Sequence, residues 1–419
     1  TVGSHDIAIA RNFEPGYSYD IILRFTDEGT VNAEVLIEEW KDNNEDIISN
    51  VETSSTFYNL SANGTANCYI VSSANFNYCF DATIKGNGNI SAMPGARIDP
   101  YISPETVKVI WSDNSELWSA EGNGSNKFHL ETDKIVEGKV LFKIIGNTAD
   151  ISDKTLKSEG NVLLGVYDAG NNCLWTWHIW LTDEPQGQEY YNNAGIMMDR
   201  NLGATSATPG NVGTLGLLYQ WGRKDPFLGS SSISSDNVAK STITWPSSVK
   251  SDSSNGTIAY ATSNPTTFII NNSNNEDWYY TGSSDVDLTR WTESSSSKSI
   301  YDPCPAGWRV PDGGDQSIWS KARGSSSDFE NSSFDWYKAY MDFSGIFGSE
   351  STILYPAAGI YNQYDGTLTN VRSTGKYWSA SKAMNSSRAK CLTFDYKGAV
   401  SPSDNTTRVT GCSVRCVKE

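Results

Sequence analysis

The sequence predicts a multidomain protein in which an all-β sandwich precedes an α+β domain. A chain of 419 residues is too long for one ordinary hydrophobic core. Aromatic residues make up 12% of the chain, and Ser, Thr, Asn and Gly fill the stretches between them, which suits short strands joined by polar turns. A polar Pro/Gly stretch at residues 182–188 is the best boundary. The predicted domains are residues 1–47, 48–184 and 186–419.

The first domain contains a hairpin. Apolar and polar residues alternate along residues 17–26 and again along residues 31–38, with a turn at residues 27–29 between them. Two strands alone are not stable in water. We therefore expect residues 1–47 to pack against the following domain, against an upstream domain lost from this chain, or against a partner.

The second domain is all-β in pattern. Residues 66–71 and 78–82 flank a Ser-Ala-Asn turn; if the two segments pair, Cys68 and Cys79 lie across a hairpin within reach of a disulfide. Short strands with this spacing predict an Ig-like sandwich. The other strands expected here are residues 107–111, 138–145, 162–167 and 174–181.

The third domain has α+β character. Residues 229–300 are rich in Ser, Asn and Thr, and they form either a large ordered loop excursion or a partly flexible one; their aromatic residues favour order. The elements expected after this region are a helix between residues 312 and 322, a helix at 335–343, and strands at 377–381, 390–396 and 413–417.

Charge excludes one class of partner. The formal net charge of −17 argues against nucleic acid, whose phosphates are held by Lys and Arg. It also disfavours an anionic membrane surface. No apolar run in the sequence is long enough to span a bilayer. Because the chain starts at Thr1 rather than Met, we interpret it as a mature or trimmed product whose targeting segment has been removed.

The seven cysteines form no C-x-x-C motif, and no zinc-ligand spacing includes the three histidines. If residues 411–417 form one strand, the sulfurs of Cys412 and Cys416 lie roughly 13 Å apart on one face. They then neither pair nor share a metal, which favours long-range disulfides and an oxidising compartment. The odd count leaves at least one thiol free, and we expect this to be Cys173. The histidines are His5, His129 and His178.

Two groups of segments resemble known families. Residues 66–71 (ANCYIV), 160–167 (GNVLLGVY) and 174–180 (LWTWHIW), with 198–204 and 217–227, resemble fimbrillin-family surface proteins of Bacteroidetes. The hairpin region 16–40 resembles the closing hairpin of a fimbrillin domain, which implies that residues 1–47 are the tail of an incomplete upstream domain.

The second group lies in the last domain. Residues 301–311 (YDPCPAGWRVP), 375–381 (GKYWSAS) and 413–417 (SVRCV) resemble the Fibrobacter major paralogous domain, which belongs to the C-type-lectin-like fold. That fold is shared with formylglycine-generating enzymes. The resemblances together extend from about residue 60 to residue 419, and the DPCPAGWRVP string is the most specific.

The resemblance implies a cell-surface adhesin, secreted, associated with the outer membrane and located in a fimbrium. Its partners would be other pilus subunits, joined by strand addition. A subunit that ends in a lectin-like domain has no obvious strand left to donate, so a tip or accessory position is favoured. One alternative is a structural shaft or assembly subunit with no ligand of its own. A remote alternative is an enzyme of the formylglycine-generating type.

The lectin-like fold also implies disulfides. The beginning and end of its core come together, so we expect a Cys304–Cys416 bridge. A second bridge is expected between Cys391 and Cys412 on neighbouring strands. The redox or copper site of formylglycine-generating enzymes needs two close thiolates, and the strand spacing of Cys412 and Cys416 argues against it.

No catalytic site is expected. The three histidines all lie outside residues 186–419, which leaves Ser-His or Cys-His chemistry there without its base. The adjacent carboxylates of Glu276 and Asp277 are the one tempting pair, but neighbours on a loop seldom face each other across a substrate. No cofactor is expected. The triplets that mark calcium-dependent sugar binding are missing, and the carboxylate-rich loops leave open a structural calcium ion.

Ligand binding is instead predicted on two loops that mix aromatic rings with amides and carboxylates. Sugars stack their apolar faces on such rings while polar side chains take the hydroxyls. The alternative is that the rings pack beneath a long loop. The candidates for binding a glycan or a protein ligand are Glu276, Asp277, Trp278, Tyr279, Tyr280, Tyr361, Asn362 and Tyr364.

Other charged residues are expected to be structural. Residues 199–201 and 223–225 combine opposite charges with neighbouring glycines and aromatic residues, which indicates a network within the core. His178 lies on a Trp-rich strand and is expected to be buried with its hydrogen bonds satisfied.

Overall fold

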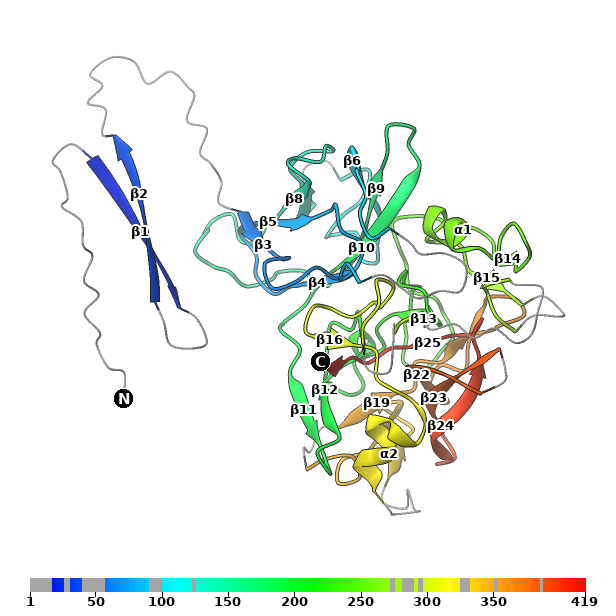
Figure 1. Cartoon of the computed structure of the whole chain (residues 1–419). Helices are drawn as coiled ribbons and strands as arrows, with labels where there is room; N and C mark the ends of the chain where they lie inside the picture. Colours follow the sequence, from blue (N-terminus) through cyan, green and yellow to red (C-terminus); the bar gives the residue numbers. More distant parts are fainter. Residues whose placement is uncertain are drawn as a thin grey trace. The chain divides into compact units, whose positions relative to one another are not determined.

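A computed structural model gives the chain as two compact units, Thr1–Ser55 and Thr56–Glu419 (Figure 1), and each is described by itself. The first is described only by the backbone of its two strands, β1 (Tyr17–Phe25) and β2 (Val31–Glu39). In the second, the described residues are 57–89, 99–122, 126–271, 276–280, 290–292, 297–324, 332–349, 353–384 and 387–419.

The first unit contains the predicted hairpin. Strands β1 and β2 pair antiparallel in an unbroken register from Tyr17 opposite Glu39 to Phe25 opposite Val31. The alternation of apolar and polar residues on both arms therefore predicted this pairing correctly. The expected turn at residues 27–29 lies outside the described residues.

Two four-stranded sheets begin the second unit (Figure 1). Their facing side chains interlock: the ring centroids of Phe80 and Trp177, one from each sheet, lie 5.3 Å apart. One sheet has the order β4 (Cys68–Val71), β10 (Cys173–Leu181), β9 (Gly160–Tyr167), β6 (Thr106–Ser112). The other has the order β3 (Phe57–Asn59), β5 (Phe76–Asp81), β8 (Lys139–Ile144), β7 (Phe128–Leu130).

The strands predicted at residues 107–111, 138–145, 162–167 and 174–181 are confirmed as β6, β8, β9 and β10. The hairpin predicted for residues 66–71 and 78–82 is wrong. Strand β4 pairs parallel with β10, whereas β5 pairs with β3 and β8 in the opposite sheet. The turn between them leads across the sandwich because Asn75, at a φ of 55°, is bonded to a distant loop: its Oδ1 accepts from Gly146 N at 2.8 Å and its Nδ2 donates to Asp153 O at 2.9 Å.

Residues after 186 form further sheets with short helices. A seven-stranded sheet runs β21 (Leu368–Thr369), β20 (Ile360–Tyr361), β25 (Gly411–Ser413), β22 (Thr374–Lys382), β23 (Arg388–Asp395), β24 (Val400–Thr407), with β13 (Leu218–Gln220) paired to β25. A four-stranded sheet runs β11 (Gly187–Tyr190), β12 (Gly195–Met198), β26 (Val417–Lys418), β16 (Trp308–Arg309). Smaller sheets pair β14 (Val249–Lys250) with β15 (Ile269–Ile270), and β17 (Ser333–Asp335), β18 (Tyr340–Asp342) and β19 (Leu354–Pro356) in that order.

The described helices are short: α1 (Ile258–Ser263), α2 (Ile318–Arg323) and the 3₁₀ turns η1 (Val212–Thr214) and η2 (Gly314–Gln316). The protein is thus mostly β-strands in several sheets, with less helix than the predicted α+β character. The helix predicted between residues 312 and 322 begins only at Ile318, where the Ser317 hydroxyl accepts from Ser320 N at 2.9 Å.

Two other predicted elements are wrong. Residues 335–343 form the end of β17, a turn at residues 336–339 and strand β18 instead of a helix. The Asp335 carboxylate accepts from the amides of Tyr337 and Lys338, both at 2.9 Å, and Ala339 has a φ of 54°. The strand predicted at 413–417 is divided between β25 and β26, which belong to different sheets. The four-residue spacing of Cys412 and Cys416 along one strand therefore does not exist.

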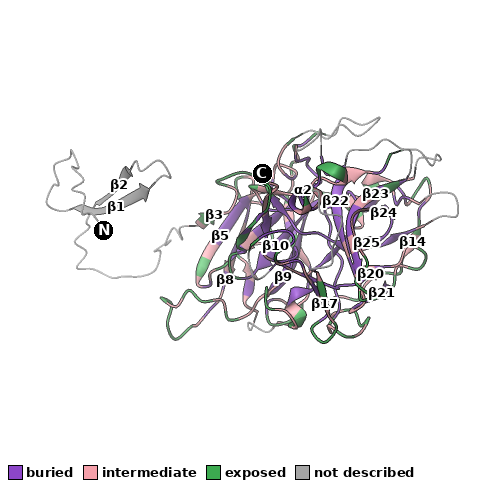
Figure 2. Cartoon of the chain, turned by 90° about the horizontal axis from the view of Figure 1, so that it is seen from below, coloured by how far each residue is buried: buried purple, intermediate pink, exposed green. Residues whose placement is uncertain are grey.

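One hydrophobic core extends across the predicted boundary at residues 182–188. It packs Trp177 and Trp180 of β10 in one cluster with Leu202, Trp221 and Cys304 from later in the chain. Figure 2 shows the strands on both sides of this boundary, such as β9, β10 and β22, as buried. The sandwich and the sheets that follow it therefore share their packing.

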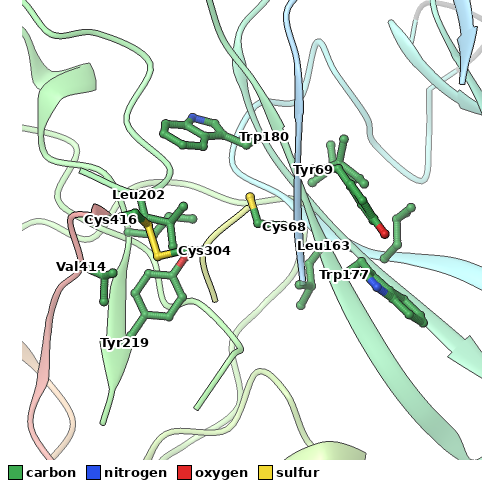
Figure 3. Close-up of a cluster of buried hydrophobic side chains, with 14 of the residues drawn as sticks. Cys68, Tyr69, Leu163, Trp177, Trp180, Leu202, Tyr219, Cys304, Val414 and Cys416 are labelled. Carbon is green, nitrogen blue, oxygen red and sulfur yellow. A yellow bond between two sulfur atoms is a disulfide. The ribbon is translucent and has the colours of Figure 1, made fainter. Parts of the chain in front are cut away.

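Cys304 and Cys416 form a disulfide, the pair that the resemblance implies, with an S–S distance of 2.05 Å and a Cα–Cα distance of 6.1 Å. Figure 3 shows it among Leu202, Tyr219 and Val414. The other five cysteines are free. Cys173 is free as predicted, although it is only half-buried.

The two other predicted bridges are wrong. Cys68 and Cys79 lie on strands of different sheets, and both are free and buried. The side chains of Cys68 and Tyr69 leave β4 on opposite faces (Figure 3). Cys391 on β23 and Cys412 on β25 are not on neighbouring strands, because β22 lies between them. Both are free thiols.

Of the charged residues expected in the core, Arg200, Arg223, Lys224 and Asp225 are buried and Asp199 is partly buried. The Arg200 guanidinium donates to Asp199 at 2.9 Å and also pairs with Asp183, and Lys224 lies 2.6 Å from Asp225. His178 is buried as predicted, and its Nε2 lies 2.7 Å from Asn161 Oδ1. Its Nδ1 has no hydrogen-bond partner among the described residues, so its hydrogen bonds are only half satisfied.

A buried lysine organises the segment that contains Cys304. The Lys298 ammonium donates to the carbonyl oxygens of Cys304, Pro305 and Trp308, at 2.7, 2.8 and 2.7 Å. The Asp302 carboxylate accepts from the amides of Cys304 and Val310, both at 2.8 Å. Charged groups thus replace the regular ladder hydrogen bonds that this irregular segment lacks.

Candidate functional site

An open pocket of about 270 Å³ lies beside β20, β23 and β24. Asn362 and Tyr364, two of the predicted ligand-binding residues, line it. Its other lining residues are mostly polar, and they are Ile360, Gln363, Lys376, Arg388, Asn405, Thr406, Thr407 and Thr410.

The turn between β20 and β21 positions both predicted residues. The Asn362 side-chain oxygen accepts from Tyr364 N at 2.8 Å, and its carbonyl accepts from Gly366 N at 2.9 Å. Gly366 has a φ of 69°, which closes the turn at low steric cost. The turn holds the Tyr364 side chain out from the sheet, and 67% of this residue is exposed.

Charges around the pocket are balanced. Arg388 donates to both carboxylate oxygens of Glu276, at 3.0 and 3.1 Å, and this pairing lowers the pKa of Glu276 and raises that of Arg388. The carboxylate of Asp404 also raises the pKa of Arg388. The Lys376 ammonium donates to the Thr406 hydroxyl at 3.0 Å. Two cations and two carboxylates therefore surround hydroxyl and amide groups.

The prediction that Trp278 and Tyr361 bind a ligand through exposed rings is wrong. Trp278 is buried, its indole donates to Trp221 O at 2.8 Å, and the Arg290 guanidinium lies 4.8 Å from its ring centroid. Tyr361 is also buried, and its hydroxyl donates to Leu228 O at 2.8 Å. Both rings instead fit the alternative, in which they pack inside the protein, because their polar atoms already have hydrogen-bond partners there.

Of the four remaining candidates, Glu276 is connected to the pocket and the other three are not. Asp277 is buried and paired with Arg290 and Arg408. Tyr279 packs edge-on against Trp278, and the Tyr280 amide donates to Gly256 O at 2.8 Å. Asp277, Tyr279 and Tyr280 do not line the 270 Å³ pocket. Glu276 reaches it only through Arg388, so the structure brings Glu276, Asn362 and Tyr364 together around that guanidinium.

Sequence reasoning missed the strand residues of this pocket. Strand β24 reads VSPSDNTT, with no alternation of apolar and polar residues to mark it as a strand. Lys376 and Arg388 lie on β22 and β23, just outside the strands predicted at residues 377–381 and 390–396. The one local signal was the run of Asn, Thr and Asp at residues 404–407 in an otherwise strand-rich region.

A second hollow, an apolar groove of about 300 Å³, lies at an open side of the sandwich. Strands β3 and β4 are the outermost strands of their sheets, and both border it. Tyr58 is 61% exposed and Phe76 is 41% exposed. The residues that line this groove are Tyr58, Leu60, Ile70, Val71, Ser72, Ser73, Phe76, Tyr78 and Glu184.

Strand β4 presents backbone groups toward the outside of its sheet. Its bonds to β10 use the carbonyls of Asn67 and Val71, which accept from His178 N at 2.8 Å and from Thr182 N at 3.2 Å. Because backbone groups of successive residues point to opposite edges, those of Ile70 and Ser72 point away from β10. This outer edge is bridged at Cys68 to Pro305, so the part of it that borders the groove is Ile70 to Ser72. The groove therefore combines an open strand edge with exposed aromatic side chains.

The free thiols are poorly suited to chemistry. Burial raises the pKa of Cys391 to about 11 and raises that of Cys412 well above its usual value, whereas a reactive thiol needs a lowered pKa. Within the described residues, no group of three His, Cys, Asp or Glu side chains is placed to hold a metal ion. None of the described helices is long and apolar enough to cross a membrane.

These two hollows differ in chemistry as well as in place. The polar pocket suits a hydroxyl-bearing ligand, and the apolar groove suits an extended chain that pairs with β4 or β3.

Comparisons of the chain with protein-family models, with curated proteins and with solved structures find no match.

Proposed function

We propose that the protein is a secreted cell-surface adhesin, a tip or accessory subunit of a pilus, which binds a glycan through the pocket around Tyr364. One observation carries this proposal. An exposed aromatic ring lies beside a preformed pocket of about 270 Å³ lined by amide and hydroxyl groups.

The chemistry of the pocket favours a neutral sugar over a charged one. The C–H face of a sugar ring stacks on tyrosine, while Asn405, Gln363 and the threonines exchange hydrogen bonds with hydroxyls. Lys376 and Arg388 are offset by Glu276 and Asp404, so no excess charge selects an acidic ligand. The volume is close to the lower end of the range for small-molecule sites, which suits one ring of a longer glycan.

The apolar groove supports the part of the proposal that concerns assembly. An extended segment of another pilus subunit would pair with the outer edge of β4 and place side chains against Tyr58 and Phe76. The Cys304–Cys416 disulfide is the kind of bond that persists in an oxidising, extracellular setting. Location at the cell surface and in a fimbrium is part of the same proposal.

The proposal assigns no catalytic activity. The formylglycine-generating alternative needs two close, reactive thiolates, but Cys416 is held in a disulfide and Cys412 has a raised pKa. The alternative of a structural shaft or assembly subunit needs only the groove. A binding experiment on the polar pocket distinguishes these readings.

The test is a titration of the full chain against an array of neutral and acidic glycans. We expect saturable binding to neutral glycans, and a loss of about tenfold in affinity when the stacking ring is removed in Tyr364→Ala. Tyr337→Ala is the matched control, because Tyr337 is 86% exposed and lies outside the pocket. Undiminished binding by a folded Tyr364→Ala variant would place the site elsewhere. An array without hits would favour the structural subunit.

A further inference from the structure

A third hollow, a cavity of about 590 Å³, lies where the loops of residues 203–217 and 228–240 meet the ends of β6 and β9. Its floor is apolar, formed by the buried side chains of Leu215, Leu217 and Leu228. Val212 and Val238 also line it and are each 44% exposed. The volume is well within the range of sites that enclose a small molecule.

Hydrogen bonds fix the walls of this cavity. Thr205 N donates to Gly213 O at 2.9 Å, and Ala239 N donates to Gly229 O at 2.8 Å. Gly203 has a φ of +81°, and a Cβ atom there would lie 2.5 Å from Leu217 Cγ, so this glycine lets the backbone approach the leucine floor. The cavity is therefore preformed and needs little ordering when a ligand binds.

A carboxylate lines the inner side of the cavity. Asp113 accepts from Asn161 N at 2.7 Å and from Asn161 Nδ2 at 2.6 Å, and the Asn161 side-chain oxygen is committed to His178. Among the described residues, Asp113 has no ion-pair partner; Lys240 also lines the cavity, but it is exposed and forms no ion pair with Asp113. Burial raises the pKa of Asp113 to about 6.

We propose that this cavity binds a small molecule with an apolar body and a single positively charged amine. The amine faces Asp113 and supplies the positive charge that this carboxylate lacks, while the body covers Leu215, Leu217 and Leu228. Lys240 repels a second cationic group, and Asp113 repels an acidic ligand. This site is independent of the proposed glycan pocket, since the two have no lining residue in common.

A pair of fluorescent probes tests the role of charge. N-(5-aminopentyl)dansylamide has an apolar fluorophore and one amine, and N-pentyldansylamide is the matched probe without the amine. We expect the full chain to shift the emission of the first probe to shorter wavelength and to bind it about tenfold more tightly than the second. In Asp113→Asn, the two probes should bind with equal affinity.

A second variant tests the place of binding. Val238→Trp puts a large ring at a partly exposed position on the cavity wall and should abolish binding of both probes. Val136→Trp is its matched control, because Val136 is 40% exposed and does not line the cavity. Equal affinity of the native chain for both probes would overturn the proposal, as would binding that survives Val238→Trp or the absence of any emission change. If Asp113→Asn fails to fold, the comparison of the two probes on the native chain and the Val238→Trp variant still test the proposal.

Discussion

Asp277 and Arg290 form a fully buried ion pair, and both residues are 0% exposed. Arg290 Nη1 donates to Asp277 Oδ1 at 2.9 Å while Nη2 pairs with Oδ2, and Arg408 donates to the same carboxylate at 3.1 Å. The Trp221 ring lies 5.2 Å from the Arg290 guanidinium and 4.7 Å from that of Arg408. One buried carboxylate thus pairs with two buried guanidinium groups.

Asp277→Asn should therefore destabilise the protein strongly, by about 3–5 kcal/mol, because it removes the carboxylate that pairs with the buried Arg290 guanidinium. The measurement is the free energy of unfolding from urea denaturation. Glu276→Gln is the adjacent control. It breaks the half-exposed pair with Arg388, and it should cost at most about 1 kcal/mol. A similarly small cost for both variants would show that the Arg290 guanidinium is solvated or paired elsewhere.

The cysteine chemistry predicts a thiol count. Alkylation of the denatured protein without reductant should label Cys68, Cys79, Cys173, Cys391 and Cys412. Prior reduction should add Cys304 and Cys416. Mass spectrometry of the peptides reads the result directly. A labelled count of three or fewer without reductant would restore the additional bridges that we expected from the sequence.

The open edge of β4 predicts a pattern of hydrogen exchange. The amides of Tyr69 and Val71 point toward β10 and should be protected, whereas the amide of Ile70 points outward and should exchange much faster. Exchange resolved to single residues measures this in the isolated chain. Slow exchange at Ile70 would mean that the edge is already covered, and it would remove the support for strand addition there.

The burial of His178 predicts that the free energy of unfolding falls as the pH is lowered. Burial lowers its pKa from 6.5 to about 3, so the unfolded state binds this proton more readily than the folded state does. The stabilisation by neutral His178 is complete above pH 6.5 and is lost as the pH falls toward 3, by roughly 5 kcal/mol in all. His178→Gln should remove this loss, with His129→Gln as the control for replacing a histidine.

Two carboxyl groups act in the opposite direction over part of this range. Burial raises the pKa values of Asp113 and Asp302 to about 6, so between pH 6 and 4 the folded state takes up their protons first and is stabilised by acid. The experiment therefore compares the slope of unfolding free energy against pH in the variant and in the native chain. Equal slopes would contradict a buried neutral histidine.

The sequence predicted those strands whose signal is local. Strands β9 and β10 are apolar runs that end at turns, and β1 and β2 alternate with period two, so periodicity was sufficient. The pairing of β4 and β5 was not predictable in this way. The direction of the turn between them depends on bonds from Asn75 to residues 71 and 78 positions further along the chain.

The same dependence on residues distant in the sequence limited the prediction of the candidate site. Tyr364 and Asn362 lie on a tight turn whose bonds are local, and both line the pocket of about 270 Å³. Trp278 and Tyr361 have the same composition around them, but their partners Trp221 and Leu228 are 57 and 133 residues away. Composition does not reveal whether an aromatic ring faces a ligand or the core. The order of the strands was equally unpredictable: Cys391 on β23 and Cys412 on β25 form no bridge because β22 lies between these two strands.

Lys298 has a consequence for how the segment around Cys304 responds to its surroundings. Its ammonium lies among three carbonyl oxygens at 2.7 to 2.8 Å, as a cation bound from solution would. This cation is covalently tethered to the chain, so it is not lost by dilution or removed by a chelator. The loop that brings Cys304 to Cys416 therefore carries its own positive charge as part of the chain.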